Sequence, residues 1–166
     1  MAAVPANDWE QPSPCAGWTA RDVVRHLVEW FPEFLTAAGG PMLTPGPNVD
    51  NDPLGAWRHL DAQVQALLDN PSASAATVSH PRAGEHRLDT AIDMFFRGDV
   101  FLHTWDLSRA TGQDEHLDEA MAAEMLAGME PIAEQLAASG QYSPRVEVDP
   151  DASVQERLLA VSGRHR

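Results

Sequence analysis

Lysine is absent from this chain, and cysteine and isoleucine are almost absent. All 11 basic residues are therefore arginine, and against 25 acidic residues they leave a formal net charge of −14. Such an acidic chain repels phosphate backbones and anionic lipid surfaces, which argues against nucleic-acid or membrane partners. The single cysteine, Cys15, excludes an internal disulfide and any multi-cysteine zinc or iron–sulfur site.

Long apolar runs are missing as well. No stretch approaches the roughly 18 residues of a transmembrane helix, and the N-terminus lacks the basic region followed by an apolar region that a secretory signal peptide has. The chain does have 166 residues, 43% of them hydrophobic, which is enough for one core. We therefore expect a single cytoplasmic domain over residues 1–166.

Helix-forming residues dominate the composition. Alanine occurs 25 times and isoleucine twice, which favours helix over strand. The sequence predicts an all-α fold, most simply a helical bundle. Residues 1–18 are expected to form an extended lead-in, and residues 140–166 a C-terminal extension with a short helix. Apolar spacing and capping patterns predict helices at about 20–38, 53–70, 88–110, 117–139 and 153–162.

Local signals refine these boundaries. Thr19 followed by Asp22 predicts a variant of the capping box at the start of the first helix. Pro32 predicts a kink or break inside that helix, and Pro131 predicts a kink inside the fourth. Because no convincing apolar alternation occurs, we expect a loop over 71–87, with at most a short extended piece at Thr77–Ser79.

Three polar side chains fall on the apolar face of the third predicted helix. On a wheel of 100° per residue, His103 and Asp106 lie within about 40° of Asp99. Burying an unpaired carboxylate costs several kcal/mol, so a cation or hydrogen-bond donors must compensate. Asp99 and His103, four residues apart, can both reach one metal ion. A hydrogen-bonded network, in which an aspartate orients His103 or pairs with an arginine, also fits the spacing.

A catalytic zinc site needs a third protein ligand and an open position. His26 lies at the edge of the apolar face of the first helix, a position that suits a side chain reaching into the seam between helices and equally suits a solvent-facing histidine. The other histidines are expected to be exposed. Cys15 has no histidine near it in the sequence and is expected to be a small packing residue. Trp105 lies off the apolar arc and is expected to pack against a secondary interface.

Three stretches together resemble one known family. They are WEQPSPCAGWTARDVVRHLV (9–28), DVFLHTWDLSRATG (99–112) and QERLLAVSGR (155–164). They resemble the DinB-like helical metal-binding superfamily, and within it the proteins related to the N-terminal domain of mycothiol-dependent maleylpyruvate isomerase.

The resemblance implies a helical bundle that holds a divalent metal ion, usually zinc, with His26, Asp99 and His103 as ligands. It also implies a thiol co-substrate, mycothiol, which the metal converts to a thiolate that attacks an electrophilic small molecule. Asp106, one turn from His103, is the expected partner that orients its imidazole. No catalytic residue beyond these is predicted.

The chain departs from the family pattern in three ways. Asp99 stands where glutamate is common, and it has the shorter reach. Only eight residues precede Trp9, where the family normally has a further helix, so we expect a bundle without that helix. Either the start is truncated, or another segment fills the groove, or a partner subunit does so in a homodimer. The isomerase's C-terminal domain, which contributes to catalysis, has no counterpart, so isomerase activity itself is not implied.

Two other functions stay open. Two histidines and one carboxylate also match the facial triad of non-haem iron enzymes, although that triad commonly occurs on β scaffolds. Alternatively, the chain is a non-catalytic helical interaction module with a structural or vestigial metal site.

Overall fold

The structure is a computed structural model that describes residue 1 and residues 4–165. The described chain is mostly helical, as predicted, with one two-stranded antiparallel sheet. None of its helices is both long and apolar enough to cross a membrane. The elements are α1 (Ala20–Ala37), α2 (Pro53–Asp69), α3 (Pro71–Ser74), β1 (Thr77–His80), β2 (Gly84–Arg87), α4 (Leu88–Ala91), the π-helical segment η1 (Ile92–Arg97), α5 (Gly98–Ala110), α6 (Glu119–Met129), the 3₁₀ turn η2 (Glu130–Ile132), α7 (Ala133–Ala138) and α8 (Val154–Val161).

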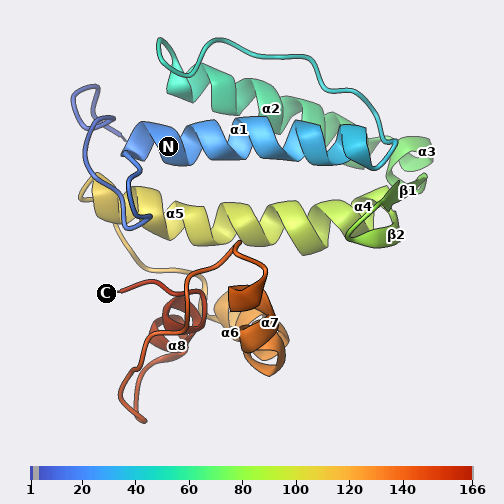
Figure 1. Cartoon of the computed structure of the whole chain (residues 1–166). Helices are drawn as coiled ribbons and strands as arrows, with labels where there is room; N and C mark the ends of the chain where they lie inside the picture. The colour runs from blue at the N-terminus through green and yellow to red at the C-terminus, as the bar shows by residue number, and fades with distance from the viewer. Residues whose placement is uncertain (2–3, 166) are drawn as a thin grey trace.

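Helix α5 lies in the middle of the molecule (Figure 1). Helix α1 runs alongside it and packs in turn against α2, whereas α6, α7 and α8 lie on the opposite side of α5. A helix covered on two sides buries more than one face. This explains why Trp105, expected at a secondary interface off the apolar arc, is fully buried.

Helix α1 begins as the sequence predicted. The backbone N–H of Asp22 donates to the Thr19 hydroxyl, and the Thr19 N–H donates to the Asp22 carboxylate at 2.9 Å, which completes the capping box. The helix continues through Pro32 without a break. Its apolar side is fully buried, while His26 lies half-buried at the edge of that side.

The loop expected over 71–87 contains a β-hairpin. Strand β1 pairs with β2 in a register that places Thr77 opposite Arg87 and His80 opposite Gly84. The sequence missed β2 because its residues, Gly-Glu-His-Arg, have little strand propensity. Tertiary contacts hold the hairpin instead: Val78 is buried, and the Ser79 N–H donates to the Ala38 carbonyl at 2.9 Å.

The third and fourth predicted helices each change geometry along their length. The third helix, predicted at 88–110, is continuous but passes through the π-helical turn η1 before α5. The fourth is interrupted by η2 at Pro131, as its proline predicted. Helix α8 matches the short C-terminal helix predicted at 153–162 and packs against α6.

The apolar contacts between α1 and the third helix gather near the hairpin. We call this group the hairpin-end core: Phe31, Leu35, Leu88, Ile92 and Phe96, all 5% exposed or less. The rings of Phe31 and Phe96 stack with their centroids 4.2 Å apart. Further along the same two helices, polar residues replace this core.

Candidate metal centre

His26 of α1 meets Asp99 and His103 of α5 where the two helices run side by side. His26 Nε2 lies 3.0 Å from Asp99 Oδ2, and His103 Nε2 lies 3.4 Å from Asp99 Oδ1. Ligand atoms from all three residues lie within 4.8 Å of one another. The structure thus brings together the three residues that the sequence singled out.

The spacing of these atoms suits a small divalent ion. Zinc bonds to nitrogen or oxygen of about 2.0–2.1 Å in tetrahedral geometry separate neighbouring ligand atoms by roughly 3.3 Å. The distances from His26 Nε2 and His103 Nε2 to the nearest Asp99 oxygen, 3.0 Å and 3.4 Å, are close to that value, and they involve different oxygens. The short side chain of Asp99 therefore reaches both imidazoles.

Aromatic rings surround the three candidate ligands. Trp30, one turn after His26, donates its indole N–H to Asp99 Oδ2 at 2.7 Å. Trp18 stacks against His103 with ring centroids 5.8 Å apart and lies 5.1 Å from the ring of His26. The side chains of His26 and Asp99 stay 30% and 20% exposed, so a small molecule can reach the site. Sequence reasoning missed both tryptophans, although the spacing of Trp30 from His26 was a usable signal.

Asp106 lies behind His103, away from Asp99. Its Oδ2 is 2.8 Å from His103 Nδ1, and the carboxylate is fully buried. With Nδ1 hydrogen-bonded to Asp106, Nε2 faces Asp99 and His26. Metal-binding histidines are commonly fixed by a carboxylate on their other ring nitrogen in this way.

Arg164, from the turn after α8, completes the surroundings of Asp106. Its Nε contacts both carboxylate oxygens, at 2.9 and 3.1 Å, and its Nη2 contacts Oδ2 at 2.6 Å. Because Asp106 has no access to water, this two-pronged pair compensates its charge. An aspartate paired with an arginine was one of the arrangements that the sequence left open, but spacing could not identify Arg164, which lies 58 positions from Asp106.

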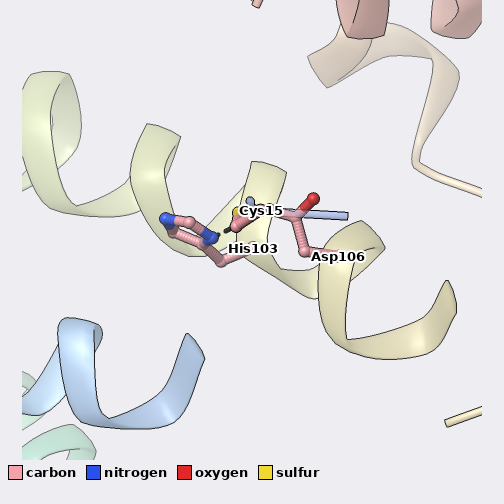
Figure 2. Close-up of side chains that lie close together, drawn as sticks. All are labelled: Cys15, His103 and Asp106. Atoms are coloured by element: carbon pink, nitrogen blue, oxygen red, sulfur yellow. Dashed lines mark hydrogen bonds and ion pairs between the residues drawn. The ribbon is translucent and has the colours of Figure 1, made fainter. Parts of the chain in front are cut away.

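Cys15 also lies beside this pair, although no histidine is near it in the sequence. Figure 2 shows Cys15, His103 and Asp106 gathered together, and the thiol donates to Asp106 Oδ2 at 3.4 Å. These three residues form a second group with ligand atoms within 4.8 Å of one another. Arg164 already occupies both oxygens of Asp106, so this group is the poorer place for an ion.

Charge pairing sets the protonation of the cluster. Burial works against the charged form of each group, but the hydrogen bonds to Asp106 and Asp99 outweigh it and raise the pKa of His103 to about 11. Burial likewise raises the pKa of Asp99, but its bonds with His103 and His26 hold that pKa well below its ordinary value. Without a metal ion, His103 is therefore a cation between two carboxylates.

The remaining histidines lie elsewhere. His59 contacts the hydroxyl and carbonyl of Thr44, and His80 stacks on Phe34 with ring centroids 4.5 Å apart. His86 contacts the Ala83 carbonyl in the hairpin. None of them joins a group of metal-ligand atoms among the described residues.

Comparison with known proteins identifies the family of the chain. The family model described as the mycothiol maleylpyruvate isomerase N-terminal domain matches residues 1–109. Two curated relatives, the uncharacterized proteins Rv0738 and MT0763 from two strains of Mycobacterium tuberculosis, are each 31% identical over 127 residues, which is 76% of this chain and 68% of theirs. No solved structure matches the chain significantly. The chain therefore belongs to the mycothiol maleylpyruvate isomerase N-terminal domain family, a family of DinB-like domains.

Proposed function

We propose that this domain binds a zinc ion through His26, Asp99 and His103 and activates a mycothiol-type thiol there for transfer to an electrophilic small molecule. The observation that carries the proposal is the convergence of two imidazoles and one carboxylate from two adjacent helices, with separations close to those of a zinc site. Bound zinc supplies the positive charge that lowers a thiol's pKa toward neutrality.

The charges around the site favour an anionic ligand. Asp99 and Asp106 are negative and Arg164 is positive, so neutral imidazoles leave one net negative charge. A divalent ion makes the site positive by one unit, and a single thiolate makes it neutral. A dianionic ligand would leave an excess negative charge beside the buried Asp106.

The protein's own residues position the reactants. Asp106 keeps Nε2 of His103 directed toward Asp99, and Trp30 fixes one oxygen of Asp99. Trp18 covers the imidazoles of His26 and His103 on one side, which excludes water there. The exposed edge of His26 and Asp99 leaves an approach for the thiol.

Metal analysis of the purified chain tests the first half of the proposal. We expect about one zinc per chain by mass spectrometry in the wild type, and background zinc in His103→Ala. His59→Ala is the control, because His59 is hydrogen-bonded and half-buried but lies outside the site. Equal metal content in all three proteins would contradict the proposal.

Cobalt substitution tests the thiol. Adding mycothiol to the cobalt-loaded chain should produce a sulfur-to-cobalt charge-transfer band, and His103→Ala should not show it. Transfer is then assayed with chlorodinitrobenzene, in which the thiolate sulfur bonds to the ring carbon and chloride leaves. Anaerobic loading with ferrous iron, followed by oxygen, tests the alternative iron chemistry: oxygen consumption with iron and no thiol band with cobalt would favour it.

One feature supports a second, non-catalytic candidate. Asp99 already has three polar partners, His26, His103 and Trp30, so the cluster is also satisfied as a hydrogen-bonded network. A chain that folds stably, retains no zinc and gains no stability from added zinc would be an interaction module with a structural polar network.

A further inference from the structure

The C-terminal part of the chain approaches the metal centre although it lies outside the region matched by the family model, residues 1–109. We infer that Arg164 is a positioning residue of this centre: by holding both oxygens of Asp106, it fixes the imidazole of His103 with Nε2 directed at the metal position. The inference rests on the proposed metal binding and extends it to a residue that touches no ligand atom itself.

The geometry of the contact supports this role. Arg164 reaches both oxygens of Asp106, and its side chain is only 10% exposed. Such two-pronged contacts constrain the plane of a carboxylate, which a single contact does not. Asp106 Oδ2 is the atom that also contacts His103 Nδ1. The orientation of the guanidinium therefore determines the orientation of the imidazole through one shared oxygen.

The turn that carries Arg164 is built for this approach. Gly163, two residues after the last residue of α8, has a φ of +76°, a conformation that residues other than glycine rarely adopt. A Cβ at this position would lie 2.6 Å from the Ser143 carbonyl oxygen. The Arg164 N–H donates to the Leu159 carbonyl at 2.8 Å. The turn therefore directs Arg164 back toward α5 along the segment that contains Ser143.

Tyr142, the residue before Ser143, lies in the same surroundings. Burial, followed by the negative charge of Asp99, raises the pKa of its phenol, and the charge of Arg164 acts in the opposite direction. Tyr142 packs with Leu102 of α5 and Leu158 of α8 in one apolar cluster. Two residues of the C-terminal segment are therefore close to the centre.

Charge compensation explains why an arginine is needed. A metal-bound histidine is neutral, so in that state His103 no longer balances the charge of Asp106. Asp106 is fully buried and would then be an uncompensated anion, which costs several kcal/mol. Arg164 keeps the carboxylate paired whether His103 is charged or neutral.

Arg164→Ala, compared with Arg157→Ala, tests the inference. Arg157 also belongs to the α8 region, but it pairs with Glu130 at the surface and is 41% exposed. We expect Arg164→Ala to weaken zinc binding by about 10–100-fold in competition with a chelator, and Arg157→Ala to change it by less than about twofold. A simple charge effect has the opposite sign, since removing a cation should strengthen zinc binding. Unchanged or tighter binding in Arg164→Ala would overturn the inference.

Two further variants separate positioning from stability. Arg164→Lys keeps the charge without the two-pronged contact, and we expect it to restore only part of the affinity. If Arg164→Ala does not fold, Asp106→Asn combined with Arg164→Ala removes both buried charges together. In the Asp106→Asn background, Arg164→Ala should then lower the zinc affinity by no more than about twofold, because Arg164 can no longer act on His103 through the Asp106 carboxylate. A fully additive loss would exclude that path.

A readout without metal separates this inference from the proposed function. The Nδ1–H proton of His103 is shielded by Asp106 and Arg164, so its NMR signal should be visible in the metal-free wild type and in Arg157→Ala. In Arg164→Ala, exchange with water should abolish it. If the wild type binds no zinc, the proposed function fails, while loss of this signal still supports the role of Arg164 and its persistence overturns it.

Discussion

The seam between α1 and the long helix that ends in α5 has two parts with opposite chemistry. In the hairpin-end core, Phe31 stacks on Phe96 among aliphatic side chains. About one turn away, His26, Asp99 and His103 occupy the same seam. Apolar burial is non-directional and tolerates exchange of similar shapes. Buried charged residues tolerate few substitutions, because each charge needs an oppositely charged or hydrogen-bonding partner at a fixed position.

The largest expected difference comes from substitutions that preserve shape. Asp106→Asn removes the charge that balances the buried Arg164, and we expect it to lower the free energy of unfolding by about 3–5 kcal/mol. Leu35→Met, in the hairpin-end core, should cost less than about 1.5 kcal/mol. Urea unfolding of both variants measures the difference, and equal losses would remove the distinction between the two parts.

The gain in unfolding free energy from metal binding should depend on the polar part of the seam and not on the hairpin-end core. Zinc at about 100 times its dissociation constant adds about 2.7 kcal/mol to the free energy of unfolding. We expect this gain in the wild type and in Leu35→Met, and no gain in Asp99→Asn, which lacks the carboxylate whose two oxygens contact the two histidines. Thermal unfolding with and without zinc measures it. A gain that survives in Asp99→Asn would place the ion elsewhere.

The pH should act through the polar part as well. Folding raises the pKa of His103 from 6.5 to about 11. The stability that its positive charge contributes is therefore fully present below pH 6.5 and is lost as the pH rises through about 11. Zinc must displace this proton. Apparent zinc affinity should therefore rise about tenfold, or about 1.4 kcal/mol, per unit between about pH 7 and pH 9. Titration at buffered free zinc measures this slope, and a flat profile would mean that His103 is already neutral.

The smallest effect concerns a helix end. Thr19→Ala removes the side-chain cap of α1, and we expect a loss of about 1 kcal/mol in the free energy of unfolding. The added stability from zinc should stay unchanged, because Thr19 contacts none of the three candidate ligands. Calorimetry with and without zinc checks both values. A smaller zinc effect in this variant would show that the polar part depends on local helix stability and not on its charges alone.

The sequence predicted what depends on local order. The cap at Thr19, the start of the second helix at residue 53 and the interruption at Pro131 each depend on neighbouring residues, and the structure has all three. The shared face of Asp99 and His103 follows from helical spacing within one element.

What the sequence could not predict depends on contacts between distant segments. Arg164 and Cys15 reach Asp106 from opposite ends of the chain, and no periodicity connects them. Trp105 packs at a secondary interface, as expected, but a wheel drawn for one helix could not identify the layer of helices that covers α5 there. The hairpin depends on pairing between residues with weak strand propensity.

The π-helical turn η1 immediately precedes α5. It sets the rotation of α5 about the helix axis relative to the residues before the turn. A turn closed by i→i+5 hydrogen bonds contains one residue more than an α-helical turn, so everything after it is rotated by roughly the 100° that one residue spans. Deleting one residue within Ile92–Arg97 would restore α geometry and swing Asp99 and His103 away from His26. The same rotation would displace Phe96 from Phe31 and turn the buried residues of α5 away from their partners. The polar cluster and the apolar core around α5 therefore depend on one and the same helical register.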